Sequence, residues 1–214
     1  MKFIFWTNSW DAGTEYLEKN ISLQDISQKH DFYFMNSGAK SEEAIKKLYN
    51  GKCINCENDK AVKGDVLFKE LASVSYDVLI RIDLDAIIFD LDGLLRKIEE
   101  NTAGEGHFVL GNTKKFRGRR TTNKKYRGIK YVRGACNATS KSVIDKIDMI
   151  TEENAGFDIP YAMSFHKTGC KLLSCKLFEI NKKYTGKHPV WHPTGKGAEK
   201  FRIFSREIEK YGKA

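Results

Sequence analysis

The chain has 214 residues, of which 41% are hydrophobic and 12% aromatic, the composition of a globular protein with an apolar core. No apolar run approaches the roughly 18 residues of a membrane-spanning helix, and the apolar start is too short for a signal peptide. We therefore expect a single domain without transmembrane helices, located in the cytoplasm. The five cysteines, an odd number, are expected to be free thiols.

Positive charge is concentrated in one part of the sequence. The net charge is +9, yet residues 106–144 contain eleven lysines and arginines and no acid, so the rest of the chain carries +9 less eleven, or −2. A local basic block attracts an anion such as a nucleotide, a nucleic acid or a membrane surface. Phe116, Tyr126 and Tyr131 lie within the block, a pattern suited to stacking on nucleic-acid bases.

Apolar and amphipathic segments alternate through the first half of the sequence. Strands are expected within residues 2–8, 31–38, 76–83 and 107–112, and helices over residues 12–28, 41–51, 63–74 and 92–100. Ser41 is the expected N-cap of its helix. Because residues 76–83 are nearly all apolar, their strand should be buried on both faces, as in a parallel sheet. The alternation predicts a three-layer α/β/α fold with a mostly parallel central sheet.

The stretch RIDLDAIIFDLDGLL, residues 81–95, contains the tripeptide Asp-Leu-Asp twice. The first copy follows the predicted strand 76–83 at its carboxyl end, where open α/β sheets bind ligands. On an extended segment, Asp83 and Asp85 would point to the same side. Two adjacent carboxylates repel each other unless a cation lies between them, and oxygen ligands favour Mg²⁺ or Mn²⁺. The first copy therefore predicts a metal site.

The second copy, Asp90 to Asp92, directly precedes a predicted helix, and its carboxylates can cap the unpaired N–H groups of that helix. The string IIFDLDG also resembles the opening motif of haloacid-dehalogenase-type phosphatases, in which the first Asp is a nucleophile. The sequence departs from that motif, because Leu94 stands where Thr or Ser usually follows the Gly. A phosphatase that uses Asp90 and Asp92 is kept as an alternative.

With the first Asp-Leu-Asp at a strand end, the order of motifs resembles a metal-dependent glycosyltransferase of the Rossmann-like GT-A fold over most of the chain. KFIFWTNSW resembles the edge that meets the nucleotide base, and YDVLIRIDLDAII resembles the strand with the Asp-x-Asp motif. YVRGACNATSKSVIDKI, GFDIPYAMSFHKTGCKL and VWHPTGKG resemble later segments of these enzymes. A small transferase with a basic loop is similar to virus- or phage-encoded members, which would place it in the host cytoplasm.

The resemblance implies a nucleotide-sugar donor, most simply a UDP-sugar, bound together with Mn²⁺ or Mg²⁺. Asp83, Asp85 and His192 would ligate the metal, and Lys196 would contact the diphosphate. Gly134 and Ala135 would let the sugar or the acceptor approach the backbone. The donor site expected from the resemblance consists of Thr7, Asn8, Lys63, Arg81, Asp83, Gly134, Ala135 and Lys196.

The second half of the chain is expected to bind the acceptor, so that residues 1–105 form the nucleotide-sugar-binding half and residues 106–214 the acceptor-binding half of one domain. Asp158 falls where many inverting members carry the base that deprotonates the acceptor hydroxyl. Glu152 and Glu153 are nearby substitutes for this role. A retaining enzyme needs no such base. The acceptor-binding residues expected within the basic block are Arg117, Arg119, Arg120, Tyr126 and Arg127.

The basic block suggests an anionic acceptor, either DNA with a modified base or a viral or protein-linked glycan. DNA binding would depend strongly on salt, whereas glycan binding would not. A non-catalytic nucleic-acid-binding protein is a third interpretation. It would use the basic block but would leave Asp83, Asp85 and His192 without a role.

Overall fold

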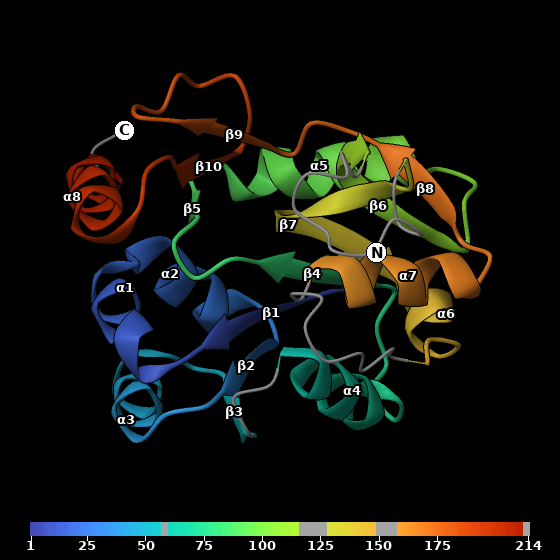
Figure 1. Ribbon diagram of the computed structural model, residues 1–214, viewed down its shortest axis with the longest axis horizontal. Helices are drawn as coiled ribbons and strands as arrows, with labels where there is room; N and C mark the ends of the chain where they lie inside the picture. The colour runs from blue at the N-terminus through green and yellow to red at the C-terminus, as the bar shows by residue number, and fades with distance from the viewer. Residues whose placement is uncertain (57–59, 116–127, 149–157, 212–214) are drawn as a thin grey trace.

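The computed structural model describes residues 1–56, 60–115, 128–148 and 158–211. The described residues form a seven-stranded central sheet in the order β3-β2-β1-β4-β7-β6-β8 (Figure 1). These strands are β1 (Phe3–Ser9), β2 (Phe32–Asn36), β3 (Lys52–Asn55), β4 (Val78–Ile82), β6 (Phe108–Lys115), β7 (Lys130–Ser140) and β8 (Lys171–Ser174). Strand β7 runs antiparallel to both of its neighbours, and the other neighbouring pairs are parallel.

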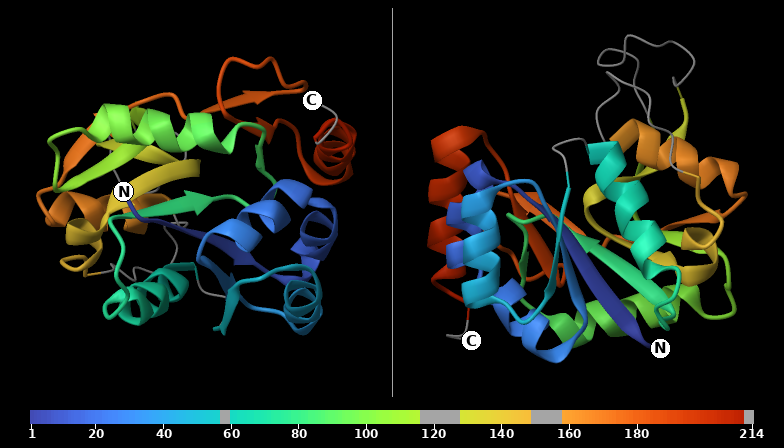
Figure 2. Two further views of the ribbon diagram at one scale, coloured as in Figure 1. Left: turned by 180° about the vertical axis from the view of Figure 1, so that it is seen from behind. Right: turned by 90° about the horizontal axis from the view of Figure 1, so that it is seen from below.

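Helices cover both faces of the central sheet, which gives the three layers that the sequence predicted (Figures 1 and 2). One face packs against α1 (Thr14–Lys19), α2 (Ile21–Lys29), α3 (Ala39–Leu48) and α5 (Leu91–Thr102). The other face packs against α4 (Lys60–Leu71), α6 (Lys141–Ile144) and α7 (Asp158–Lys167). No helix in the described ranges has the length and hydropathy needed to cross a membrane.

A second, three-stranded sheet lies beside the carboxyl end of β4. It consists of β5 (Ile87–Ile88), β10 (Val190–Pro193) and β9 (Phe178–Asn181), in that order. Helix α8 (Gly197–Ile208) packs on this sheet through Phe204 and Trp191, and it lies beside α1 in both views of Figure 2. This sheet brings the end of the chain back to the loop that follows β4.

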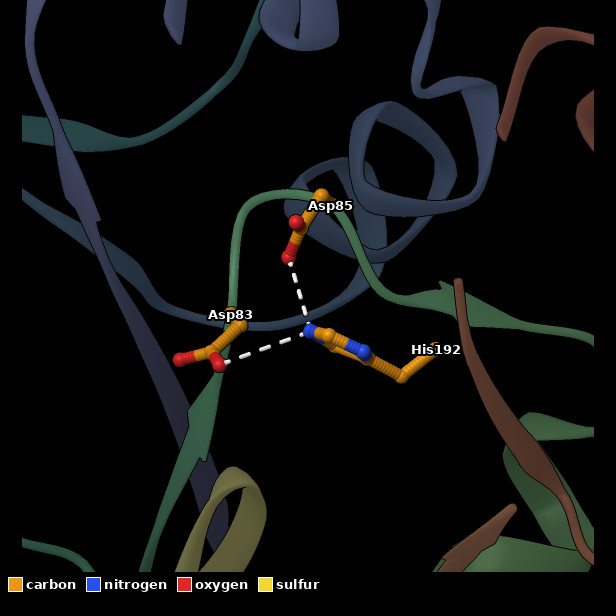
Figure 3. Close-up of side chains that lie close together, drawn as sticks. All are labelled: Asp83, Asp85 and His192. Carbon is orange, nitrogen blue, oxygen red and sulfur yellow. Dashed lines mark ion pairs between the residues drawn. The ribbon is translucent and has the colours of Figure 1, made fainter. Parts of the chain in front are cut away.

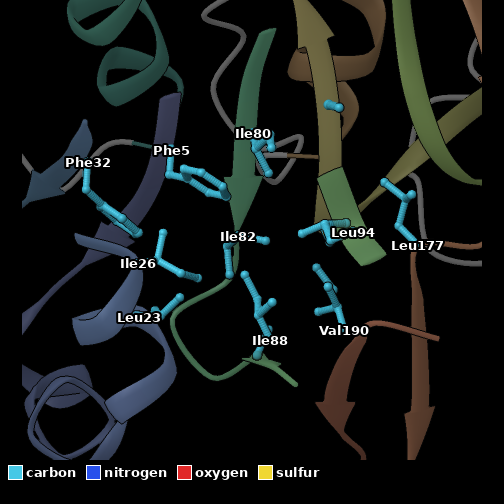
Figure 4. Packing of buried hydrophobic residues seen from close by; sticks show 14 of the residues in the cluster. Phe5, Leu23, Ile26, Phe32, Ile80, Ile82, Ile88, Leu94, Leu177 and Val190 are labelled. Carbon is cyan, nitrogen blue, oxygen red and sulfur yellow. The ribbon is translucent and has the colours of Figure 1, made fainter. Parts of the chain in front are cut away.

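The larger core lies between the central sheet, its first helical face and the second sheet. Phe5, Ile80, Leu23 and Val190 come from four different elements of this cluster and are all buried (Figure 4). At about 25 cal/mol per Å² of apolar area, burial of such side chains is the main favourable term that holds the β4 end rigid. The five cysteines are free thiols, as predicted: Cys53, Cys56, Cys136, Cys170 and Cys175.

Two local predictions were wrong. The helix expected over residues 12–28 is split at Asn20, whose side-chain oxygen accepts the Leu23 N–H and so caps a new helix. Gly38, not Ser41, is the N-cap of α3, because the Ser41 hydroxyl instead donates to Asn36 Oδ1 at 2.6 Å. In both cases a side-chain hydrogen bond that hydrophobic periodicity does not reveal lies at the start of the helix.

Candidate functional site

The first Asp-Leu-Asp forms a tight turn directly after β4. The Ala86 N–H donates to the Asp83 carbonyl at 2.9 Å, and the Asp83 N–H donates to the Ala135 carbonyl of β7 at 3.0 Å. The extended geometry expected for Asp83 and Asp85 is therefore wrong, since residues 84–85 lie in a turn. The turn is nevertheless fixed at both ends, so the two carboxylates have defined positions.

His192 of β10 points between these two carboxylates (Figure 3). Its Nε2 atom lies 3.1 Å from Asp85 Oδ1 and 3.8 Å from Asp83 Oδ2. One ligand atom from each of the three side chains lies within 4.8 Å of the others. The structure thus brings together the three residues that the sequence suggested as metal ligands, although His192 is more than 100 residues away from the pair.

Two cations lie against the carboxylates. The Lys200 ammonium of α8 forms an ion pair with Asp85, and Arg81 Nη2 lies 3.1 Å from Asp83 Oδ1. Burial alone would raise the pKa of the Asp85 carboxyl. The hydrogen bond to His192 and the charges of His192 and Lys200 outweigh that effect and lower the pKa to about 2. Asp85 is therefore a carboxylate at neutral pH.

The donor set fits a divalent cation. Carboxylate oxygens suit Mg²⁺ and Mn²⁺, and an imidazole nitrogen beside them is compatible with Mn²⁺. The Asp85 side chain is only 16% exposed, so its charge requires a nearby cation. Asp83, Asp85 and His192 can therefore hold a metal. In the structure, the charge of the Asp85 carboxylate is balanced by the Lys200 ammonium.

The buried Asn20 side chain is hydrogen-bonded to the backbone of the Asp-Leu-Asp turn, a role that the sequence did not suggest. Its amide nitrogen donates to the carbonyls of Leu84 at 3.0 Å and Ala86 at 2.8 Å. The same side chain accepts from Leu23 and from the Ser22 hydroxyl, and Asn20 is fully buried. The residue that breaks the predicted helix is thus the residue that fixes the backbone of the Asp-Leu-Asp turn.

No protein-family model matches the sequence, and a search of curated proteins found no significant match. Solved structures do resemble it. A galactosyltransferase, LgtC, in complex with donor and acceptor sugar analogues is 12% identical, with a TM-score of 0.60 over 99% of this chain and 96% of that one. Staphylococcus aureus TarS 1-349 in complex with UDP-GlcNAc is also 12% identical, with a TM-score of 0.57 over 94% and 61%.

The chain has the fold of the GT-A glycosyltransferases. Nucleotidyltransferases share it, since a cytidylyltransferase from Leptospira borgpetersenii is 16% identical with a TM-score of 0.54, over 82% of this chain and 76% of that one. The fold class predicted from the sequence is confirmed.

In this GT-A fold, three of the predicted donor residues, Thr7, Asn8 and Arg81, lie near the carboxyl ends of β1 and β4. Thr7 and Asn8 are in β1; Thr7 is fully buried, and Asn8 is partly buried. Lys63 of α4 is buried, and its ammonium donates to the Ser9 carbonyl at 3.2 Å and to the Ser37 hydroxyl at 2.8 Å. Arg81 is buried in β4 with its guanidinium 5.7 Å from the centre of the Trp6 ring.

Gly134 and Lys196 occupy different surroundings. A Cβ atom on Gly134 would lie 3.0 Å from Arg81 Nη2, so the missing side chain gives room to the arginine that pairs with Asp83. Ala135 contributes the carbonyl that accepts from Asp83. Lys196 is exposed at the N-cap of α8, whereas Lys200, one turn further on, reaches Asp85. Of these two lysines, the structure brings only Lys200 to the metal-ligand group.

Some of the predicted side chains lie outside the described part of the structure. Asp158 begins α7, but its side chain is outside the described part of the structure, as are Glu152 and Glu153. The predicted acceptor-binding residues also lie outside the described residues: Arg117, Arg119, Arg120, Tyr126 and Arg127.

The second Asp-Leu-Asp serves a local role. Asp90 is the N-cap of α5, and its Oδ1 accepts the Gly93 N–H at 2.8 Å, as one interpretation of the sequence predicted. Asp92 lies exposed in the first turn of the same helix. A carboxylate used as a cap stabilises the helix without any catalytic function.

A polar network at the ends of β1, β2 and β3 was not predicted. Asn36 accepts from the hydroxyls of Ser9 at 3.0 Å and Ser41 at 2.6 Å, and it donates to Asn55 at 2.8 Å. Asp11 accepts the Ser41 N–H at 3.1 Å. Small polar residues at strand ends are common in turns, and only the sheet order shows that these converge. The network makes the edge of the GT-A sheet next to Asn8 polar and ordered.

Proposed function

We propose that this protein is a metal-dependent glycosyltransferase that moves a sugar from a nucleotide-sugar, most simply a UDP-sugar, to an acceptor hydroxyl. The observation that carries the proposal is the convergence of Asp83, Asp85 and His192 at the carboxyl end of β4, in a chain with the GT-A fold. Two structural neighbours support it, because one was solved with donor and acceptor sugar analogues and the other with UDP-GlcNAc.

In this proposal, Asp83, Asp85 and His192 hold Mn²⁺ or Mg²⁺. A divalent metal bound there supplies positive charge to offset the charge of the diphosphate leaving group. Asn8 and Lys63 lie at the β1 end of the sheet, where we place the nucleoside. Arg81 keeps Asp83 in position through its 3.1 Å ion pair.

A lysine contact to the diphosphate is also part of the proposal. Lys196 was the residue expected from the sequence, but Lys200 is closer to the metal-ligand group, since its ammonium forms an ion pair with Asp85. With a divalent cation held by Asp83, Asp85 and His192, the Lys200 ammonium would be free to contact a phosphate oxygen. We therefore assign the diphosphate contact to Lys200 and a weaker, outer contribution to Lys196.

Acceptor activation remains assigned to Asp158, as the base of an inverting reaction. Residues 1–105 are proposed as the donor half and residues 106–214 as the acceptor half. The metal-ligand group draws on both halves, because His192 comes from the second. The acceptor is proposed to be anionic, and the protein to act in the cytoplasm.

A nucleotidyltransferase is the second candidate function, because the cytidylyltransferase from Leptospira borgpetersenii shares the fold. The two reactions release different products. A glycosyltransferase releases a nucleoside diphosphate from a nucleotide-sugar, and it often does so slowly with water alone. A nucleotidyltransferase releases pyrophosphate from a nucleoside triphosphate.

The test measures both products with Mn²⁺ present. We expect nucleoside diphosphate from at least one nucleotide-sugar, reduced about 100-fold or more in Asp85→Asn, in line with the loss of a group that stabilises leaving-group charge. Asp92→Asn, which removes an exposed carboxylate near in sequence, should keep wild-type activity. Pyrophosphate release from CTP with a sugar acid or sugar phosphate, and no diphosphate release, would instead establish the second candidate.

A further inference from the structure

Strands β6 and β7 extend beyond the rest of the central sheet as a pair. Strand β8 pairs with β6 only over residues 108–111, and β4 pairs with β7 only over residues 136–140. The pairing of β6 with β7 continues further, through Thr113↔Val132, Lys114↔Tyr131 and Lys115↔Lys130. We call residues 113–115 and 130–132 the two-stranded ribbon. Neither of its strands has another strand beside it among the described residues.

The ribbon carries three lysines whose charge no acid in the described part of the chain balances. Lys114, Lys115 and Lys130 are all exposed, and none forms an ion pair with an acid in the described ranges. Lys115 lies directly opposite Lys130, and like charges in directly opposed positions destabilise a strand pair. Residues 106–144 contain no acid, so no close neighbour in sequence balances this charge. A bound polyanion would remove this repulsion.

Two further cationic groups, Arg133 and Lys167, come from segments next to the ribbon. Arg133 follows the ribbon on β7, with its guanidinium 5.6 Å from the centre of the Phe178 ring. Lys167 is exposed at the end of α7, which contacts β7 through a 2.7 Å hydrogen bond between His166 Nε2 and the Lys130 carbonyl. From Lys130, β7 leads to Ala135, whose carbonyl accepts from Asp83, a distance of roughly 17 Å at the usual rise of a strand.

We propose that the two-stranded ribbon is a nucleic-acid-binding element that contacts the phosphates of a duplex. A two-stranded ribbon fits the major groove, which is about 12 Å wide, and lysines on it can neutralise the flanking phosphates. A narrow ribbon of two strands is less suited to a flat membrane surface, where a broad basic face makes more contacts. Binding of the duplex is independent of the proposed glycosyltransferase function; only the role of that nucleic acid as acceptor rests on it.

The test is the binding of a fluorescent 20-base-pair DNA duplex to the full chain, followed by anisotropy across a series of salt concentrations with a chelator present. Because neither metal nor nucleotide is involved, a failure here leaves the donor-site proposal untouched. The test variant is Lys114→Gln/Lys115→Gln/Lys130→Gln. The control variant removes three exposed lysines from other elements, Lys29→Gln/Lys47→Gln/Lys187→Gln, and so changes the net charge equally.

We expect the wild-type protein to bind the duplex with an affinity that falls steeply with salt. Loss of three phosphate contacts should weaken binding at least about tenfold and reduce the slope of log K against log salt by about 2 to 3, while the control stays within about twofold. Equal binding by the ribbon variant and the control would overturn the proposal. Tighter binding of heparin than of DNA, lost in the same ribbon variant, would also overturn it in favour of a sulfated or acidic glycan.

Discussion

Lys200 is the residue that most changes the expected chemistry of the candidate site. Its ammonium forms an ion pair with Asp85, and the two side chains are 23% and 16% exposed. A cation that binds Asp85 must displace this ammonium or share the carboxylate with it. Lys200 therefore both stabilises the protein without metal and competes with the metal.

Replacing Lys200 by Met should raise the affinity for Mn²⁺ about five- to tenfold, corresponding to about 1 kcal/mol of relieved competition. Calorimetric titration of Mn²⁺ into the protein measures this directly. Lys196→Met removes the same charge from the exposed N-cap of α8 and should leave the affinity unchanged. Weaker Mn²⁺ binding by Lys200→Met would mean that the lysine supports the metal site.

The low pKa of Asp85 predicts an acid-sensitive contribution to stability. Its pKa falls from an ordinary 3.8 to about 2 in the folded chain. A folded-state pKa below the unfolded value stabilises the protein above pH 3.8, and this contribution is lost as the pH falls towards 2. The difference amounts to roughly 2 kcal/mol.

Urea unfolding of metal-free protein at pH 5 and pH 2.5 checks this contribution. Asp85→Asn should be less stable than the wild type at pH 5. The difference in their free energies of unfolding should be smaller at pH 2.5. Asp92→Asn serves as the control for the loss of an exposed carboxylate. If the difference in free energy of unfolding between wild type and Asp85→Asn is the same at both pH values, then ionisation of Asp85 does not stabilise the folded protein.

The individual site residues were predictable to different degrees. Asp83 and Asp85 stand out because a carboxylate pair after an apolar run is a local pattern. His192 could be named only because a family resemblance linked its segment to that pair. Lys200 and Asn20 could not be chosen from the sequence, since their roles depend on contacts with Asp85 and Ala86 that span many residues.

At the level of secondary-structure elements, the break between α1 and α2 is the feature that shapes the site. The periodicity of residues 12–28 favours one helix, although Asn20 is a residue type that often caps the start of a helix. The break lets the Asn20 side chain donate to Leu84 and Ala86 while it caps α2. The residue at this element boundary thus also holds a turn more than 60 residues away.

Asn20→Ala should destabilise the protein by about 2–4 kcal/mol, because two carbonyls in a buried turn lose their donor and α2 loses its cap. The free energy of unfolding in urea measures this loss. Mn²⁺ affinity should fall as well, since the Asp-Leu-Asp turn is no longer held. Asn101→Ala removes an exposed asparagine from α5 and should change both quantities little. If Asn20→Ala is destabilised but binds Mn²⁺ with unchanged affinity, then the hydrogen bonds of Asn20 to the turn do not contribute to metal binding.

Across the whole molecule, the alternation of strands and helices was sufficient to predict the layers and the mostly parallel sheet. It did not predict the second sheet, because β5, with two residues, and β9 and β10, with four each, are too short to leave a pattern. That sheet carries His192 and supports α8. The part of the fold that completes the site is thus the part with the weakest sequence signal.

The thermal midpoint of the protein with uridine diphosphate, measured with and without Mn²⁺, tests the donor site. At about 100 times its dissociation constant, a ligand adds about 2.7 kcal/mol of stability, which shifts the midpoint by several degrees. We expect a shift that needs both metal and nucleotide, is lost in Asp85→Asn and persists in Asp90→Asn. No shift with any nucleoside diphosphate, or a shift lost only in Asp90→Asn, would contradict the donor site at Asp83, Asp85 and His192.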